Sequence, residues 1–179
     1  MERIVKRRTP AVVAALRGKY PVAHATVCGR SLCGRSIYAF TIGEGDGPAV
    51  YTAGYHGQEW LTTLVLLRFL EELCYALTNG KELAGVPVAP ALEGHSAVFL
   101  PCVNPDGVEI ALHGPRAAGK YQQLVERAMR GSVEKWNANA RGVDINHNFD
   151  AGWLTARRME REMGITGPAP RRYGGERAE

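Results

Sequence analysis

The stretch that decides the fold runs from residue 97 to residue 107 and reads Ala-Val-Phe-Leu-Pro-Cys-Val-Asn-Pro-Asp-Gly. Its first seven residues are apolar without interruption, a pattern typical of a strand that is covered on both faces inside a sheet. The last four, Asn104-Pro105-Asp106-Gly107, are turn-forming residues that follow this strand directly. Because α/β sheets commonly place their ligand sites beyond the carboxyl ends of strands, the sequence predicts a site near this turn.

The segments on either side of this strand predict helices. Between residues 60 and 77 apolar side chains recur at helical spacing, which indicates an amphipathic helix with one wide buried face. Thr78-Asn79-Gly80 is expected to end it. Further helices are predicted over residues 11–20, 121–129 and 154–163.

Two more apolar segments precede the long helix. Residues 36–42 and 49–53 are rich in β-branched and aromatic side chains, and the glycine-rich segment 43–48 separates them. This arrangement predicts a β-hairpin. The order of strands and helices favours an α/β fold, a mixed sheet flanked by helices on both faces.

Composition sets the broad class of protein. The chain has 179 residues, of which 45% are hydrophobic and 22% are charged, as in an ordinary soluble domain. The net charge of +4 comes partly from arginines near the end, without the stacking aromatic residues of a nucleic-acid module. Apolar runs are too short for a membrane span. The charged residues 1–8 lack the pattern of a secretory signal, so we expect a cytoplasmic protein without nucleic-acid or membrane partners.

The four cysteines do not form a recognisable motif. Cys28, Cys33, Cys74 and Cys102 lie in predicted apolar elements, and no two of them make a C-x-x-C pair. Such pairs are typical of structural zinc sites and of redox-active sites. We therefore expect reduced thiols that are mostly buried.

A histidine and a glutamate at a predicted strand-to-helix junction form the first candidate site. Residues 55–60 read Tyr-His-Gly-Gln-Glu-Trp, so His56 and Glu59 can converge. Zinc binds imidazole nitrogen and carboxylate oxygen, and a catalytic zinc site takes three protein ligands and leaves a position for water. The same pair also suits a structural role, because a glutamate favours a helix N-terminus and a neighbouring histidine can cap or pack.

A second polar segment lies downstream. Residues 136–150 read Trp-Asn-Ala-Asn-Ala-Arg-Gly-Val-Asp-Ile-Asn-His-Asn-Phe-Asp, a dense set of amides and carboxylates with one arginine. This composition suits neither a core strand nor a helix. It predicts side chains that bind one another or a polar ligand, since unpaired polar groups are costly to bury. The alternative is a polar surface loop.

With these blocks in view, the chain resembles the carboxypeptidase A type of zinc metallopeptidases. The blocks that carry the resemblance are His56-Gly57-Gln58-Glu59, Asn104-Pro105-Asp106-Gly107 and Gly142-Val143-Asp144-Ile145-Asn146-His147-Asn148-Phe149. They stand in the family's order and cover nearly the whole chain from about residue 20 onward. The resemblance implies the family's α/β fold and a zinc cofactor.

The resemblance also implies roles for individual residues. His56 and Glu59 match the first two zinc ligands, and Asp144 matches the carboxylate that orients the first ligand. Asn146 and His147 match the pair that holds the terminal carboxylate of the substrate. The family usually has arginine at the second position of that pair. Histidine there changes recognition, because a guanidinium binds a carboxylate through two donors at once.

Other positions depart from the family pattern. The arginine that polarises the scissile carbonyl follows a tryptophan in the family, but Asn137 follows Trp136 here. Arg141 is the nearby arginine, and it either takes over this role or only faces the edge of the sheet.

The family also requires a third ligand, a histidine, and a general-base glutamate further downstream, and neither has a counterpart in these residues. His24, His95 and His113 match no ligand position and are expected on the surface or in loops. We therefore expect residues 1–179 to form the N-terminal part of a single zinc carboxypeptidase catalytic domain, incomplete in its fold and inactive by itself.

Within the family, the likeness is to bacterial peptidases that cleave γ-D-glutamyl-meso-diaminopimelate bonds in cell-wall peptides. It rests on Arg-Gly-Val-Asp-x-Asn-x-Asn-Phe and Asp-Ala-Gly-Trp within residues 141–153. This resemblance implies hydrolysis of a peptide or isopeptide bond near a free carboxylate. Two alternatives stay open: an amidohydrolase of the related aspartoacylase-like branch, and a non-catalytic binding module on the same scaffold.

Overall fold

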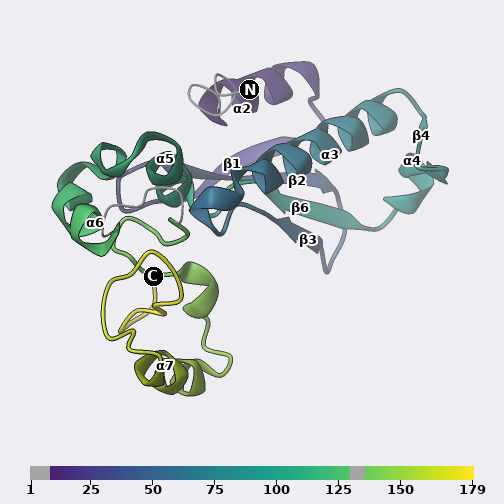
Figure 1. The fold of residues 1–179 in the computed structure, drawn as a ribbon. Helices are drawn as coiled ribbons and strands as arrows, with labels where there is room; N and C mark the ends of the chain where they lie inside the picture. The colour runs from purple at the N-terminus through teal and green to yellow at the C-terminus, as the bar shows by residue number, and fades with distance from the viewer. Residues whose placement is uncertain (1–8, 130–135) are drawn as a thin grey trace. The chain divides into compact units, whose positions relative to one another are not determined.

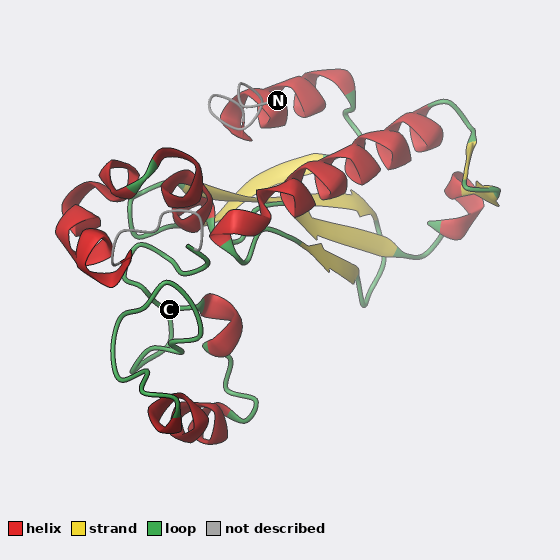
Figure 2. Ribbon diagram, in the orientation of Figure 1, coloured by secondary structure: helices red, strands yellow, loops and turns green. Residues whose placement is uncertain are grey.

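The computed structural model describes residues 9–129 and 136–179 (Figures 1 and 2). They form two compact units, which we describe separately. The first unit contains the described residues up to Gly29, with Ile37–Ala53 and Thr62–Cys102. The second contains Arg30–Ser36, Gly54–Leu61 and the described residues from Val103 to Glu179. The charged residues 1–8, on which the expected location rested, lie outside the described ranges.

The first unit is built on a four-stranded sheet with the strand order β1-β2-β6-β3. Its strands are β1 (His24–Arg30), β2 (Ser36–Gly43), β3 (Ala49–Thr52) and β6 (Ser96–Leu100). β6 pairs antiparallel with β2 and parallel with β3. The apolar run that predicted an interior strand therefore does lie inside the sheet.

The predicted hairpin between β2 and β3 is wrong, because β6 lies between these two strands. β3 and β6 are parallel, with Tyr51 opposite Phe99, and α3 (Trp60–Thr78) connects them. A parallel pair needs such a long crossover, which is usually a helix. The turn residues 43–48 show only that the chain reverses, whereas the apolar β6 requires a neighbour on each side.

Two longer helices and a small peripheral sheet complete the first unit. α2 (Thr9–Lys19) and α3 flank the sheet (Figure 1). The small sheet pairs β4 (Glu82–Leu83) with β5 (Val86–Pro87), and the short α4 (Val88–Ala91) follows. The core brings together buried apolar side chains from α2, α3 and the strands, among them Leu16, Phe40, Ile42, Leu70 and Phe99. The unit is thus the mixed sheet flanked by helices that the sequence predicts.

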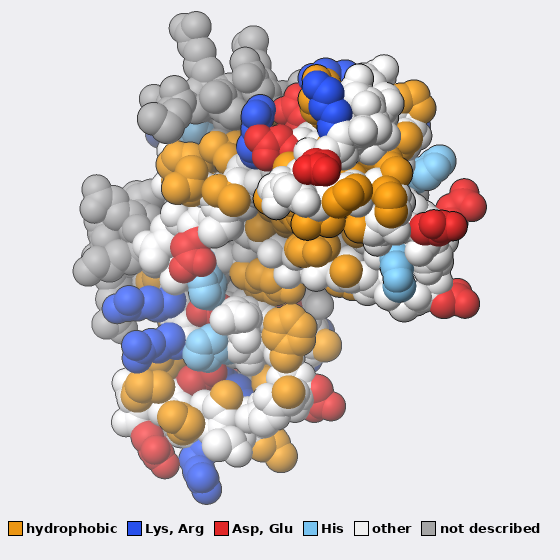
Figure 3. All heavy atoms as spheres, turned by 90° about the vertical axis from the view of Figure 1, so that its right-hand side faces the viewer, with side chains coloured by type: hydrophobic (Ala, Val, Ile, Leu, Met, Phe, Trp, Pro, Cys, Tyr) orange, Lys and Arg blue, Asp and Glu red, His pale blue; other side chains and the backbone are white. Residues whose placement is uncertain are grey.

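β3 is one of the two edge strands of this sheet, and all four of its residues are exposed. Val50 and Tyr51 are 60% and 40% exposed, and Val65 on α3 is 63% exposed. Figure 3 shows several hydrophobic side chains on the face that it draws, interspersed with charged and other groups. Among the described residues, no helix combines the length and the apolar character that a membrane crossing requires.

The second unit consists of helices and irregular segments. Its helical elements are η1 (Gly57–Glu59), α5 (Pro105–His113), η2 (Pro115–Tyr121), α6 (Gln122–Met129), η3 (Ile145–His147) and α7 (Trp153–Glu162). The predicted helices over 121–129 and 154–163 are confirmed by α6 and α7 within one residue. The predicted turn at 104–107 is the start of α5: the Asn104 side chain accepts the N–H of Gly107 at 2.8 Å, and proline stands in the first turn. Asparagine and proline favour helix starts as well as turns.

The cysteines are free thiols, as expected, but their burial differs. Cys74 and Cys102 are buried, Cys33 is partly buried and Cys28 is exposed. Burial raises the pKa of the Cys74 thiol to about 11. The expectation of mostly buried thiols is therefore wrong for Cys28.

Asp106 ties the segment 30–36 to α5. The carboxylate is 1% exposed and accepts the Ser31 hydroxyl at 2.7 Å and the Cys33 N–H at 2.9 Å. The Arg35 guanidinium binds it at 2.5 Å and also donates to the Ala117 carbonyl at 2.8 Å. A buried carboxylate with this many donors is stabilising only while all of its partners remain.

We expect Asp106→Ala to lower the free energy of unfolding by about 3 kcal/mol, because the change leaves three donors without their acceptor. Urea denaturation followed by circular dichroism measures this loss. Asp46→Ala, at an exposed position, is the matched control and should change stability by less than about 0.5 kcal/mol. Equal effects of the two substitutions would contradict the structural role of Asp106.

Candidate metal centre

The backbone around His56 is held by close contacts among three segments. The Gly57 N–H donates to the Asn137 carbonyl at 3.1 Å. The Asn104 amide donates to the carbonyls of Tyr55, Asn137 and Ala138 at 2.9 to 3.2 Å. Asn104 therefore joins the segment before η1, the start of α5 and the segment after residue 135.

Only glycine fits at position 57, because the neighbouring backbone leaves no room for a side chain. A Cβ atom there would lie 2.2 Å from the Gly107 carbonyl oxygen and 2.6 Å from the Trp136 carbonyl oxygen. Both are backbone atoms, so no side-chain rotation relieves the overlap. The glycine between His56 and Glu59 is thus explained by packing.

His56 and Glu59 converge in the structure. The Nδ1 atom of His56 lies 3.0 Å from Oε1 of Glu59. His56 precedes η1 in an extended conformation, and Glu59 is the last residue of η1. One turn of 3-10 helix therefore brings the two side chains to the same side.

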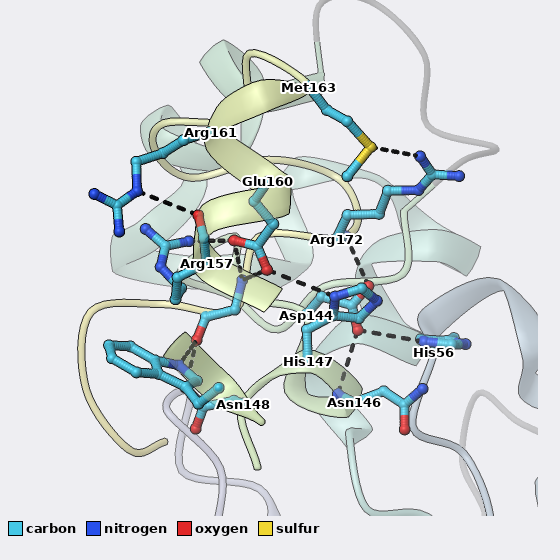
Figure 4. Close-up of polar contacts among 12 residues, drawn as sticks. His56, Asp144, Asn146, His147, Asn148, Arg157, Glu160, Arg161, Met163 and Arg172 are labelled. Atoms are coloured by element: carbon cyan, nitrogen blue, oxygen red, sulfur yellow. Dashed lines mark hydrogen bonds and ion pairs between the residues drawn. The ribbon is translucent and has the colours of Figure 1, made fainter. Parts of the chain in front are cut away.

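The second nitrogen of the His56 ring faces Asp144. Its Nε2 atom lies 3.3 Å from Oδ1 of Asp144, a residue that is 2% exposed (Figure 4). The Asp144 carboxylate also accepts the backbone N–H groups of Asn146 at 3.3 Å and of Arg172 at 2.7 Å. Its orientation is therefore fixed by the backbone of two segments.

Both nitrogens of the His56 ring face a carboxylate, Nδ1 that of Glu59 and Nε2 that of Asp144. A neutral imidazole carries one N–H, so a metal ion between Nδ1 and Glu59 would leave the proton on Nε2, where the Asp144 carboxylate accepts it. Asp144 is thus placed to prepare His56 as a ligand.

The side chains of His56 and Glu59 fit a zinc site both in type and in the separation of their donor atoms. Two ligands of a tetrahedral zinc ion at ~2.0 to 2.2 Å lie about 3.3 Å apart, close to the observed separation of Nδ1 and Oε1. Across the described part of the chain, no group of three His, Cys, Asp or Glu side chains is placed to hold a metal. His56 and Glu59 thus supply two converging donors of types that zinc binds, and the described residues place no third side chain to hold a metal with them.

The remaining predicted site residues have other partners. Asn146 is exposed, and its backbone N–H is the group that contacts Asp144. Nδ1 of His147 lies 3.6 Å from Glu160. Arg141 forms an ion pair with the Glu179 carboxylate at 2.5 Å.

The first part of the segment 136–150 is not a polar surface loop, because residues 136–140 and 142–144 are buried, whereas residues 146, 149 and 150 are exposed. Its amides bind the backbone, as one of the two sequence interpretations required: Oδ1 of Asn139 accepts the N–H groups of Arg141 at 2.8 Å and Val143 at 3.1 Å. Asn137, at the position where the family has arginine, has a buried Oδ1 without a hydrogen-bond partner in the described residues.

The remaining histidines are His24, His95 and His113. His24 in β1 and His95 are exposed, as expected. His113 differs, because it is partly buried at the end of α5 and its Nε2 atom is buried.

Comparisons with known proteins agree with the motifs and the geometry. A family profile described as zinc carboxypeptidase matches residues 10–179. The chain belongs to the zinc carboxypeptidase family.

Individual relatives are similar in sequence to much of this chain. It is 33% identical over 166 residues to the γ-D-glutamyl-L-diamino acid endopeptidase 1 of Lysinibacillus sphaericus, covering 92% of the chain and 41% of that protein. It is 32% identical over 129 residues to the human carboxypeptidase N catalytic chain, covering 68% of the chain and 24% of that protein. The chain thus spans less than half the length of these relatives.

A solved structure supports the fold. The carboxypeptidase A of Helicoverpa armigera superposes with a TM-score of 0.61 at 22% identity, covering 93% of this chain and 36% of that chain. At this identity the likeness concerns the fold alone.

Proposed function

We propose that this chain is part of a zinc-dependent metallopeptidase that hydrolyses a peptide or isopeptide bond near a free carboxylate. The observation that carries the proposal is the convergence of His56 Nδ1 and Glu59, with buried Asp144 behind the ring at 3.3 Å from Nε2. Zinc, when bound, supplies Lewis acidity for amide hydrolysis. In this proposal residues 1–179 are the N-terminal part of a single catalytic domain, and the third ligand and the general-base glutamate lie elsewhere.

Each residue has a defined task in the proposal. His56 and Glu59 hold the metal, and Asp144 keeps the proton of His56 on Nε2. Asn146 and His147 bind the carboxylate of the substrate. Arg141 is the candidate for polarising the carbonyl, and its present partner is Glu179. Because only two ligands and no glutamate base are assigned here, we expect no hydrolysis by the 179-residue chain alone.

One relative supports a substrate class for this proposal. A γ-D-glutamyl-L-diamino acid endopeptidase is 33% identical to this chain, which supports a γ-D-glutamyl-diaminopimelate bond of cell-wall peptides as the substrate. A cytoplasmic place of action, suited to recycling such peptides, is part of the same proposal.

The recognition of the carboxylate is tested with His147→Ala. We expect the variant to bind a γ-D-glutamyl-meso-diaminopimelate peptide about 10-fold more weakly, because a hydrogen bond to a charged group contributes roughly 1.5 kcal/mol or more. Binding of the amidated peptide should not change. Isothermal titration calorimetry of the zinc-loaded 179-residue chain measures both affinities.

Two results decide this test. His95→Ala, which removes an exposed imidazole, should leave both affinities as they are. Equal losses for the free and the amidated peptide in His147→Ala would show that His147 does not bind the carboxylate.

A further inference from the structure

A buried acidic side chain lies in the second unit outside the proposed metal centre. Glu160 on α7 is 1% exposed. Its carboxylate forms an ion pair with Arg157 and accepts the Gly174 N–H at 3.2 Å (Figure 4). Arg157 is itself 8% exposed and stacks on the Tyr173 ring, 4.7 Å from its centroid. The charge of Glu160 is therefore compensated inside the unit, as a buried carboxylate requires.

Glu160 also faces His147. Its Oε1 atom lies 3.6 Å from Nδ1 of His147, which is an ion-pair distance but longer than a hydrogen bond. The His147 side chain is 36% exposed. Because Nδ1 faces the buried carboxylate, Nε2 is the ring nitrogen left for a ligand.

The short segment 172–174 connects this carboxylate to the proposed metal centre. The Arg172 N–H donates to Asp144 at 2.7 Å, and the Tyr173 carbonyl accepts the Asp144 N–H at 2.7 Å. The next residue, Gly174, donates to Glu160. The Asp144 N–H and the Glu160 carboxylate thus bind the same peptide group, between Tyr173 and Gly174, the first at its carbonyl and the second at its N–H.

Gly174 allows this close approach. A Cβ atom at this position would lie 2.6 Å from the His147 carbonyl oxygen and 3.1 Å from Oε1 of Glu160. The backbone of His147 and the carboxylate of Glu160 therefore pack against the same glycine. The close packing of both groups against Gly174 therefore fixes the position of His147 relative to Glu160.

We propose that Glu160 is a positioning residue for substrate recognition: it holds the proton of His147 on Nδ1 and directs Nε2 towards the carboxylate of the substrate. This inference rests on the proposed role of His147 in carboxylate binding. When His147 takes a second proton, its Nε2–H faces the anionic ligand while Nδ1–H stays on Glu160. The ion pair with Arg157 fixes the orientation of the Glu160 carboxylate.

The tautomer of His147 tests the first half of the proposal without metal or activity. Two-bond ¹H–¹⁵N correlation spectra of the ¹⁵N-histidine-labelled 179-residue chain distinguish the two neutral tautomers, and His147→Gln identifies the signals. We expect the proton of the neutral ring on Nδ1. A wild-type ring with the proton on Nε2 would overturn the proposal.

Glu160→Gln should reverse the tautomer. The amide oxygen of glutamine has to face Arg157, since an NH₂ group there would oppose a cation. The NH₂ group then points at His147 and donates to Nδ1, so the proton moves to Nε2. Glu162→Gln, at an exposed position of the same helix, should leave the spectrum unchanged. A folded Glu160→Gln chain that keeps the Nδ1–H tautomer would contradict the coupling.

A titration with glutarate, with glutaramide as the uncharged control, tests the second half. We expect glutarate to shift the Nε2 signal of His147 in the wild-type chain, where the doubly protonated ring donates from Nε2 while its Nδ1–H faces Glu160. Glu160→Gln should bind glutarate several-fold more weakly, because its neutral Nε2–H is a weaker donor to a carboxylate than an imidazolium. Glutaramide should have no effect on either. If the wild-type tautomer is as expected but glutarate causes no shift, then Glu160 orients His147 and the carboxylate role in the proposed function is refuted.

Discussion

His56→Ala is expected to weaken zinc binding by the 179-residue chain by more than about 100-fold, since the described residues offer two converging ligands and the variant keeps one. Asp144→Asn should weaken binding less, by about 10- to 100-fold, which is the usual effect of losing the partner of a histidine ligand. The order of the two effects follows from the geometry, because His56 offers Nδ1 to the metal and Asp144 acts only through Nε2. Calorimetric zinc titrations of the metal-free proteins measure both.

His95→Ala is the matched control for these titrations, because it removes an exposed imidazole outside the proposed centre. Its zinc affinity should equal that of the wild type. If His56→Ala bound zinc as well as the wild type, the metal would have to bind elsewhere. An effect of Asp144→Asn equal to that of His56→Ala would instead show that Asp144 is more than an orienting partner.

Gly57→Ala is expected to be among the most destabilising single substitutions in the second unit. The added Cβ would lie 2.2 Å from the Gly107 carbonyl oxygen and 2.6 Å from that of Trp136, so η1 must move away from α5. Overlap with backbone in a packed interior costs about 3 kcal/mol, and the movement also displaces His56 and Glu59. Chemical denaturation measures the loss of stability, and a zinc titration of the folded protein measures the effect on the centre.

Gly18→Ala provides the control for this substitution. Gly18 lies in α2, and a Cβ atom there meets nothing within 4 Å. Alanine in a helix should be neutral or stabilising by about 0.5 to 1 kcal/mol. A Gly57→Ala protein as stable as the wild type would mean that the three segments do not pack as closely as the structure shows.

Local patterns in the sequence predicted most of the helices and the central strand. α3 was predictable because its buried residues, from Thr63 to Ala76, recur every three or four positions on one face. β6 was predictable because its apolar run is uninterrupted. The partners of the strands were not predictable in the same way, since glycine-rich turn chemistry between β2 and β3 is the same whether the strands pair with each other or with a third.

In the site, too, some features were predictable from the sequence and others were not. The identities of His56, Glu59 and Asp144 came from the sequence motifs and their resemblance to zinc carboxypeptidases. Glu160 was missed, because it lies in a polar helix among several charged residues and has no motif. Its burial and its pairing with Arg157 and Gly174 arise only from the packing of α7 against the segment 172–174. An Arg–Glu pair three residues apart on a helix was visible, but such pairs are usually exposed.

The sequence by itself determined the chemistry that this protein has available: an imidazole and a carboxylate three residues apart, a glycine between them, and the carboxylate of Asp144 far along the chain. These are properties of residue type and spacing, which local physics can interpret. The tertiary structure alone decided that Nδ1 of His56 faces Glu59, that Nε2 faces Asp144, and that His147 has a buried acid beside it. The physical reason is that the orientation of a ring is set by contacts between segments distant in sequence, and only the folded backbone brings those segments within a few ångströms.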